Sequence, residues 1–286
     1  MIGANVAATD ISELVDLLRG RRFTVLTGAG VSTDSGLPDY RGPNSPKRSP
    51  MTYDQFVGAP AFRRHYWARN HVGWHHMRGT RTNEGHRALA RLEERGLVTG
   101  VITQNVDLLH QRAGSRRVID LHGHYNEVIC LHCGRTLSRT QLDRMLTELN
   151  PNFTREVADV EIAPDADAVL ESTEDFVVQD CPHCGGILKP NIVYFGENVP
   201  KERVAAAYRL MDDGEALLVA GSSLAVMSGL RFVRYAAKQH MPVGIINRGT
   251  TRGNDLATVH LEAGTSPTLQ ALDQALPDLA RTPERS

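Results

Sequence analysis

Short apolar runs alternate with helix-like segments along most of this chain, and no other feature restricts the possible folds as strongly. The runs cover residues 23–27, 98–103, 118–121, 191–195, 216–220 and 243–246. Runs of this kind, rich in β-branched residues and bounded by turn residues, are typical of buried strands, and their alternation with helices indicates a parallel sheet. We therefore predict an α/β fold with a doubly wound, mostly parallel, Rossmann-like sheet.

The segments between these runs carry the periodicity and the end signals of helices. We expect helices over residues 10–20, 61–79, 86–95, 204–211, 230–239 and 268–276, and another that opens at 104–110. Residues 42–60 are rich in proline, serine and glycine, so they are expected to form a long mobile loop. The aromatic residues of 61–79 are expected to pack a small helical lobe, and a surface that stacks nucleic-acid bases is the alternative.

The charge balance argues against nucleic acid and membranes as partners. The 286 residues include 32 Lys and Arg against 33 Asp and Glu, so the net charge is −1. A chain this close to neutral has no long-range field that attracts polyanions. No apolar run approaches the ~20 residues of a membrane span, and residues 1–20 lack the features of a secretion or transit signal. We expect a cytoplasmic protein.

Small or polar residues directly follow five of the predicted strands. They are Gly28, Gln104 with Asn105, His122, Gly221 with Ser222 and Ser223, and Asn247 with Arg248 and Gly249. In a parallel sheet the carboxyl ends of the strands lie at one edge, which is where ligands bind. We therefore expect these residues to line one site.

The loop after the first predicted strand carries two glycines, Gly28 and Gly30, that let the backbone turn sharply and approach a ligand. Small and hydroxyl residues follow, which suits the exposure of amide N–H groups to phosphate. However, Thr33 occupies the last position of the glycine fingerprint, and no acidic residue is evident roughly 20 residues further on. From these residues alone, a dinucleotide site and an ordinary glycine turn both remain open.

All four cysteines lie in two Cys-x-x-Cys pairs, Cys130 with Cys133 and Cys181 with Cys184. This spacing lets both thiolates of a pair reach one tetrahedral ion, and the glycine after each pair permits a tight turn. Four thiolates fill the coordination sphere, so we predict one structural Zn²⁺ that takes no part in chemistry; a redox pair is the alternative. The histidines inside the two pairs are expected to face solvent.

His122 is the candidate general base among the 12 histidines. It follows a predicted buried strand, and Gly123 after it leaves space around the ring. An imidazole titrates near neutral pH, which suits it to proton transfer. On position alone, an ordinary core or surface histidine remains the other interpretation.

Taken together, these motifs resemble the sirtuins, a family of NAD-dependent protein-lysine deacylases. The resemblance is carried, in the right order, by residues 28–32, 36–41, 103–110, 122–123, 195–197 and 221–223, by the four cysteines and by Asn247. Residues 66–70 and the long segment between the cysteine pairs look most like the class II branch, which includes the fourth human sirtuin. The resemblance implies that NAD is consumed as a co-substrate.

The resemblance also implies a role for each matching position. His122 and Asn105 are implied to be catalytic. The implied NAD contacts are Gly28, Ala29, Gly30, Ser32, Thr33, Pro38, Asp39, Tyr40, Arg41, Gln104, Asn105, Val106, Asp107, His122, Gly221, Ser222, Ser223, Asn247, Arg248, Gly249 and Thr265. Val193, Phe195, Gly196 and Glu197 are implied to hold the acyl-lysine peptide as an added strand.

The family's organisation implies three parts of the chain. Residues 1–41, 80–124 and 189–286 are expected to form the Rossmann-like NAD-binding domain. Residues 42–79 are expected to form a cofactor loop and a helical lobe, and residues 125–188 an inserted zinc-binding module.

By the same resemblance, the acyl oxygen displaces nicotinamide, His122 deprotonates a ribose hydroxyl, and free lysine and O-acyl-ADP-ribose are released. Acetyl-lysine proteins or peptides are the expected partners, with lipoyl and longer acyl groups left open. The branch that prefers succinyl or malonyl groups has an arginine where this chain has Phe56, so no strong preference for anionic acyl groups is expected. Protein mono-ADP-ribosylation, a non-catalytic NAD-sensing module and a dehydrogenase are the alternatives.

Overall fold

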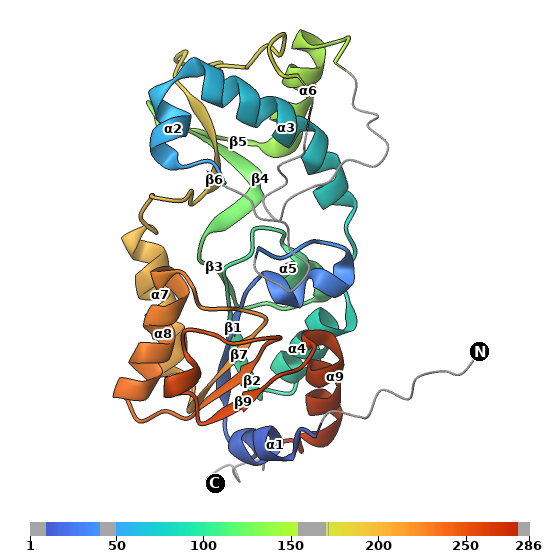
Figure 1. Cartoon of the computed structure of the whole chain (residues 1–286), viewed down its shortest axis with the longest axis vertical. Coiled ribbons are helices and arrows are strands. Elements are labelled where there is room, and N and C mark those ends of the chain that lie inside the picture. The colour runs from blue at the N-terminus through green and yellow to red at the C-terminus, as the bar shows by residue number, and fades with distance from the viewer. Residues whose placement is uncertain (1–9, 41–49, 154–169, 171, 280–286) are drawn as a thin grey trace, which may run out of the picture.

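The computed structural model describes residues 10–40, 50–153, 170 and 172–279. Figure 1 shows two lobes stacked along the long axis of the molecule, a larger one with a six-stranded sheet and a smaller one with a three-stranded sheet. None of the helices in the described residues is long and apolar enough to cross a membrane.

The six-stranded sheet is parallel throughout. Its strands are β1 (Phe23–Thr27), β2 (Val98–Thr103), β3 (Val118–Asp120), β7 (Ala216–Ala220), β8 (Val243–Ile246) and β9 (Val259–Leu261), in the order β3-β2-β1-β7-β8-β9. The strand order reverses between β1 and β7, and α/β proteins bind ligands in the crevice at such a switch point. The predicted doubly wound fold is confirmed, although β9 is not among the predicted strands.

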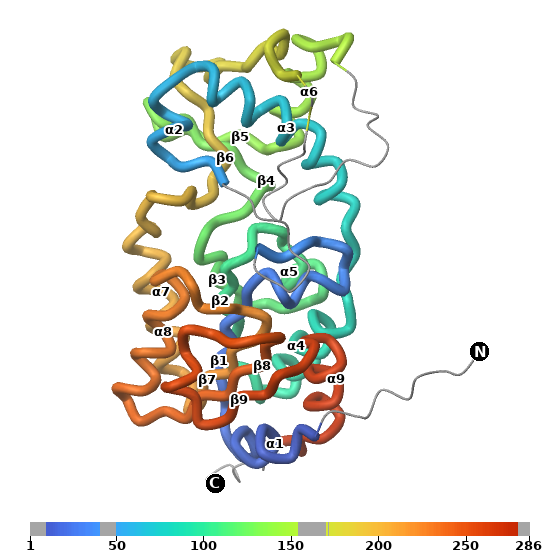
Figure 2. Tube along the Cα trace, in the orientation of Figure 1, coloured from blue at the N-terminus to red at the C-terminus, as the bar shows by residue number. Residues whose placement is uncertain are grey.

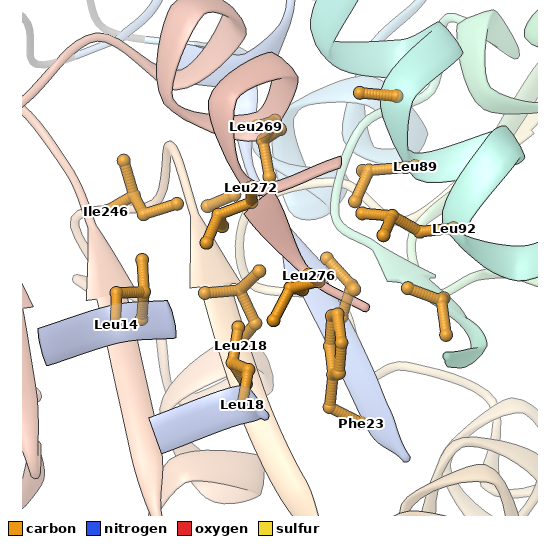
Figure 3. Packing of buried hydrophobic residues seen from close by; sticks show 14 of the residues in the cluster. Leu14, Leu18, Phe23, Leu89, Leu92, Leu218, Ile246, Leu269, Leu272 and Leu276 are labelled. Carbon is orange, nitrogen blue, oxygen red and sulfur yellow. The ribbon is translucent and has the colours of Figure 1, made fainter. Parts of the chain in front are cut away.

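Helices cover both faces of this sheet, because successive residues of a strand point to opposite sides. Phe23 lies in a buried cluster with residues of α1, α4 and α9, which Figure 3 shows, whereas Leu26 lies in a second cluster with residues of α7 and α8. The helices of this lobe are α1 (Ser12–Leu18), α4 (Glu84–Glu94), α5 (Leu109–Ala113), α7 (Lys201–Asp212), α8 (Met227–Lys238) and α9 (Thr265–Ala275).

The smaller lobe combines two segments that are far apart in the sequence, and Figure 2 shows them lying together. Its antiparallel strands are β4 (Gly123–Cys130), β5 (Thr136–Ser138) and β6 (Leu188–Ile192), and its helices are α2 (Tyr53–Gly58), α3 (Pro60–Gly79) and α6 (Arg139–Leu149). Trp67 of α3, Val128 of β4 and Leu188 of β6 share one buried cluster. The predicted packing role of the aromatic residues in 61–79 is confirmed for Tyr66, Trp67 and Trp74, while Phe62 is exposed.

The strand predicted at 191–195 belongs to the other sheet. The strand β6 ends at Ile192 and pairs with β4 of the small lobe, where Ile192 lies opposite Gly123. An apolar run predicts a strand but carries no information on which sheet receives it, so the prediction that the parallel alternation resumes here is wrong.

Two further boundaries differ because polar side chains satisfy the backbone. Thr52 and Gln55 form a capping box that begins α2, so residues 53–58 of the predicted loop are helical, whereas residues 42–49 lie outside the described residues. No helix opens at Gln104, because the N–H groups of Asn105 and Leu109 donate to the side chains of Thr103 and Asp107. The short helix α5 begins only at Leu109.

Candidate active site

A cavity of about 1140 Å³ lies at the carboxyl ends of β1, β2 and β7, and both lobes line it. The expectation that the strand-end residues converge on one site is confirmed. Of the predicted site residues, the cavity is lined by Gly28, Ala29, Gly30, Ser32, Pro38, Asp39, Tyr40, Gln104, Asn105, Val106, Asp107, His122, Val193, Phe195, Gly196, Glu197, Gly221, Ser222, Ser223, Asn247, Arg248 and Gly249.

Two predicted cofactor contacts, Thr33 and Thr265, lie outside the cavity lining. The hydroxyls of Thr33 and Thr265 both donate to the carbonyl oxygen of Gly30, at 3.1 and 2.9 Å, and neither residue is part of the cavity lining. These two hydroxyls stabilise the glycine loop without lining the cavity. Arg41 lies outside the described residues.

The two glycines of the first loop permit a close approach between loops. The loop forms two short 3₁₀ turns, η1 (Ala29–Val31) and η2 (Thr33–Ser35). A Cβ added at Gly28 would lie 2.7 Å from the carbonyl oxygen of Gly221, and one at Gly30 would lie 2.8 Å from Gly221 Cα. The N–H of Gly30 donates to that same carbonyl oxygen at 2.9 Å. The loops after β1 and β7 therefore pack backbone to backbone and leave small side chains around the cavity.

A buried polar network joins the first loop to the loop after β2. Ser32 donates to Asp107 Oδ2 at 2.7 Å, and the side-chain amide of Asn105 donates to the Ser32 hydroxyl at 3.1 Å. Burial raises the pKa of Asp107, against the opposing effect of the hydrogen bonds from Leu109 and Ser32. These contacts fix two predicted side chains, Asn105 and Asp107, at the cavity wall.

His122 stands where the chain passes from β3 of the large sheet to β4 of the small one. Its Nδ1 lies 2.9 Å from the carbonyl oxygen of Gln104, and its Nε2 lies 2.8 Å from the hydroxyl oxygen of Ser228. Burial lowers the pKa of His122 to about 4, with Arg203 and Arg231 lowering it further and the bond to Gln104 opposing. The ring is therefore neutral at pH 7 and has one nitrogen available as an acceptor.

Gly123 is needed for backbone packing, which differs from the expected role of leaving space around the His122 ring. Its φ is +78°, and an added Cβ would lie 1.9 Å from the carbonyl oxygen of Asn191. In addition, the N–H of Val193 donates to the carbonyl oxygen of His122 at 2.7 Å. The backbone of His122 and Gly123 is thus held directly against the end of β6 and the residue that follows it.

The predicted peptide-binding residues follow β6 and border the cavity. Phe195 is paired with Thr52 as a parallel bridge, and its carbonyl oxygen accepts from Tyr53 N–H at 2.9 Å. Glu197 accepts from Tyr194 N–H at 2.9 Å and pairs with the buried Lys189 at 3.0 Å. Burial lowers the pKa of Lys189 although Glu197 opposes it. These bonds fix the position of the segment, which turns at Gly196 with a φ of +83°.

The four cysteines come together in the small lobe with the spacing of a metal site. The Sγ atoms of Cys130 and Cys184 lie 3.6 Å apart, those of Cys133 and Cys181 lie 3.9 Å apart, and all four thiols are free. Tetrahedral Zn–S bonds of ~2.3 Å give S···S separations of ~3.8 Å, so the donor set fits zinc.

The turns of the cysteine pairs agree with the prediction. Gly134 and Gly185 have φ of +71° and +69°. His132 and His183 are exposed. Both histidines are therefore outside the donor set, as expected.

A second cluster of potential metal ligands escaped the sequence analysis. His71 Nδ1 and His75 Nε2 lie 2.9 and 3.3 Å from Asp143 Oδ1, with the two histidines one turn apart on α3. However, the fully buried guanidinium of Arg139 lies 3.8 Å from the same carboxylate oxygen. A cation beside the carboxylate opposes a second cation, so we interpret the cluster as an ion network of the small lobe.

Several cavity residues were not predicted, among them Met51, Tyr66, Ile192, Tyr194, Ser228 and Arg231. Most of them are apolar and belong to the small lobe, where nothing in the sequence distinguishes a cavity residue from a core residue. Ser228 and Arg231 lie on the first turns of α8. Their position one turn after a strand-end cluster is the signal that could have identified them.

The family model described as the Sir2 family matches residues 28–228. The chain is 60% identical over 277 residues to a Mycobacterium avium protein named NAD-dependent protein deacetylase 1, covering 96% of this chain and 98% of that protein. It is 48% identical over 270 residues to a Streptomyces coelicolor protein of the same name, covering 94% and 90%.

Solved structures agree with this result. A structure of Sir2 with a p53 peptide and NAD⁺ has a TM-score of 0.73 at 32% identity, covering 93% of this chain and 98% of that one. A structure of Sir2 bound to an acetylated peptide has a TM-score of 0.72 at 30% identity, covering 93% and 98%. Fold, site and similarity thus agree along nearly the whole chain, which belongs to the Sir2 family.

Proposed function

We propose that this protein removes acyl groups from protein lysines in an NAD-dependent reaction that releases nicotinamide and O-acyl-ADP-ribose. One observation carries the proposal: the half-buried, neutral His122 lines the cavity that the glycine loop borders, and Gln104 holds its Nδ1 so that Nε2 is the basic nitrogen. The names of the relatives and of the peptide-bound Sir2 structures support the same activity.

The cavity fits a dinucleotide by its chemistry. Gly28, Gly30 and Gly221 bring backbone groups to the wall where any Cβ would collide, which suits a phosphate group that needs N–H donors close by. Asn247 and Arg248 supply polar groups further along the lining. When bound, NAD supplies an anomeric carbon that loses nicotinamide readily and then carries the acyl group. Ser32 and Thr265 hold the loop that contacts it.

His122 and the residues near it are proposed to carry out proton transfer and to orient the cofactor. His122 accepts a proton at Nε2, because its Nδ1 is occupied by the carbonyl of Gln104. Asn105 and Asp107 hold fixed orientations at the wall through Ser32 and are proposed to orient the nicotinamide half of the cofactor. No role in proton transfer is required of the zinc centre, whose four thiolates leave no open position.

The acyl-lysine peptide is proposed to bind along residues 193–196 as an added strand. Recognition of this kind uses backbone groups and so accepts many sequences. The exposed Phe195, at 38% relative exposure, offers an apolar contact to the bound segment.

The acyl group is proposed to be uncharged. Phe56 is fully buried against Tyr66 and Tyr194, with ring centroids 5.4 and 5.2 Å away. Lys189, whose Nζ lies 4.7 Å from the centroid of the Tyr194 ring, is already paired with Glu197, so this cluster does not offer an unpaired cation to a succinyl or malonyl carboxylate. Acetyl peptides, with lipoyl and longer acyl peptides as further candidates, are therefore expected to turn over faster than succinyl peptides. Succinyl-lysine in first place would contradict the proposal.

The test is mass spectrometry of an acetyl-lysine peptide incubated with NAD and the purified protein. We expect nicotinamide, free lysine peptide and O-acetyl-ADP-ribose in equal amounts, and a loss of ~10²-fold or more in His122→Ala. His124→Gln, two residues along β4 and outside the cavity lining, is the matched control and should retain activity.

The same experiment separates the other functions. ADP-ribose on a protein in place of the acyl group would indicate mono-ADP-ribosyltransfer, and intact NAD after binding would indicate a sensing module. Both would overturn the proposal. A cytoplasmic location and a place in the class II branch remain proposals that rest on the sequence.

A further inference from the structure

The hydroxyl of Ser228 contacts the nitrogen of His122 that the proposed reaction uses. A carbonyl oxygen can only accept, so the 2.9 Å contact to Gln104 O places the ring proton on Nδ1. The neutral ring then has a lone pair on Nε2, and Ser228 donates its hydroxyl proton to that lone pair across 2.8 Å. Both nitrogens of the ring are thereby oriented.

The fold brings Ser228 to this position through α8. The helix begins at Met227, five residues after Ser222 in the loop that follows β7, and Gly229 packs against Gln104. A Cβ at Gly229 would lie 2.6 Å from Gln104 Oε1, so a larger residue here would displace the Gln104 side chain. The first turn of α8 therefore packs against Gln104, the residue whose carbonyl oxygen accepts the hydrogen bond from His122 Nδ1.

Gln104 is itself fixed from the other side. Its side-chain amide donates to the Ser222 hydroxyl at 2.8 Å and to the carbonyl of Thr27 at 3.2 Å. Gln104 therefore supports both contacts of the His122 ring. Its side chain is anchored to Thr27 at the end of β1 and to Ser222 in the loop after β7.

The charged groups that face His122 are cations on separate elements. Arg203 lies on α7 and Arg231 lies on α8, and both favour the neutral ring. The ring contacts described above are a carbonyl and a hydroxyl, and neither is a carboxylate. A base without a carboxylate partner depends on neutral hydrogen bonds for its orientation.

We infer that Ser228 is a positioning residue for His122. The Ser228 hydroxyl orients the lone pair of His122 Nε2 toward the cavity and then releases it, so that the ribose hydroxyl of NAD can hydrogen-bond to Nε2 instead. This inference rests on the proposed role of His122 as the base. The proton moves from the ribose hydroxyl to Nε2, and Ser228 keeps its own proton throughout. Ser228 lines the cavity and is partly exposed, so its hydroxyl can rotate away when the cofactor arrives.

The test compares Ser228→Ala and Ser228→Thr by steady-state kinetics with an acetyl peptide and NAD. In Ser228→Ala we expect kcat to fall about 3- to 10-fold, the size of one hydrogen bond, with KM for NAD unchanged. The acid limb of the pH profile should move up by about half a pH unit, because the hydroxyl stabilises the neutral ring. Ser228→Thr keeps the hydroxyl and should restore both values.

Nitrogen NMR of the His122 imidazole provides a readout that is independent of turnover. The wild-type protein should show the tautomer with the proton on Nδ1, and the Nε2 signal should shift in Ser228→Ala and return in Ser228→Thr. The His122→Ala variant assigns the signal among the 12 histidines.

Three results would overturn the inference. These are an unchanged kcat and pH profile in Ser228→Ala, a raised KM at unchanged kcat, and a Ser228→Thr variant as weak as Ser228→Ala. A double variant that combines Ser228→Ala with His122→Ala distinguishes a failure of this inference from a failure of the proposed function. Ser228→Ala should cost nothing further in a His122→Ala background, whereas full activity in His122→Ala alone would refute the base assignment itself.

Discussion

The N–H of Val193 donates a 2.7 Å hydrogen bond to the carbonyl oxygen of His122. This bond ties the candidate base to the first residue of the candidate peptide-binding segment. The distance between the two therefore does not depend on side-chain rotamers. The next residue, Gly123, maintains the same contact, since its Cα faces the carbonyl of Asn191.

Replacing Gly123 by alanine should disrupt this contact. A Cβ would lie 1.9 Å from Asn191 O at a φ of +78°, so the two segments must separate. We expect a loss of roughly 3 kcal/mol in the free energy of unfolding and a fall in kcat. Gly20→Ala is the matched control, because Gly20 has a φ of +72° with nothing within 4 Å of the added Cβ. It should cost only about 1 kcal/mol. Equal costs in urea titrations would refute the steric argument.

Removal of zinc should unfold the small lobe before the large one. The four thiolates hold together a lobe whose sheet has only three strands, and structural zinc supplies ~10 kcal/mol or more in small domains. We expect one zinc per chain by mass spectrometry of metals, with loss of the metal, of activity and of small-lobe amide protection in Cys133→Ser. His132→Ala should keep the metal. A metal-free protein with unchanged melting would contradict this prediction.

Acidification should destabilise the protein through two histidines whose neutral form the fold favours, the buried His86 and the half-buried His122. Burial lowers the pKa of His86 to about 4, with Arg87 adding to the effect, and burial does the same for His122. The unfolded chain binds protons near pH 6.5 and the folded chain does not, so stability is lost as pH falls from 6.5 toward 4. The loss by pH 5 is about 2 kcal/mol for each histidine.

Denaturant titrations from pH 7 to pH 5 measure this slope. His86→Gln should flatten it, whereas the exposed His183 replaced by glutamine should leave it unchanged. A steeper or identical slope in His86→Gln would show that other groups dominate the acid response.

Asp143→Asn should destabilise the small lobe by about 3 kcal/mol, because it leaves the fully buried Arg139 without its carboxylate. The hydrogen bond from His71 and the nearby charges keep the pKa of Asp143 low although burial opposes them, so the carboxylate is ionised at pH 7. Asp16→Asn removes an exposed partner of Arg19 and should cost less than about 0.5 kcal/mol. Similar melting shifts for both variants would exclude a structural role for the cluster.

The strands of the large sheet could be predicted because their residues are buried on both faces. The runs 23–27, 98–103, 216–220 and 243–246 coincide with β1, β2, β7 and β8. The strand β9 is short and only partly buried, and so has a weaker apolar pattern. The cavity could also be predicted, since polar strand ends must meet at one edge of a parallel sheet.

What the sequence could not predict depends on contacts between distant residues. The run at β6 pairs with β4 because of the register between Ile192 and Gly123. Likewise, Ser228 reaches His122 across 106 positions of sequence, and Asp143 meets His71 across two helices. Neither pair has a local pattern. Periodicity describes one element at a time, whereas these contacts arise from how elements are placed against each other.

The passage from β3 to β4 has a mechanical consequence. The strand β3 ends at Asp120 and β4 begins at Gly123, so two residues, Leu121 and His122, join one sheet to the other. A linker this short contains no slack. In the described residues the chain also crosses between the lobes after α3 and after β6, but this crossing is the shortest of the three, so a motion of one lobe relative to the other would bend the backbone that carries the imidazole.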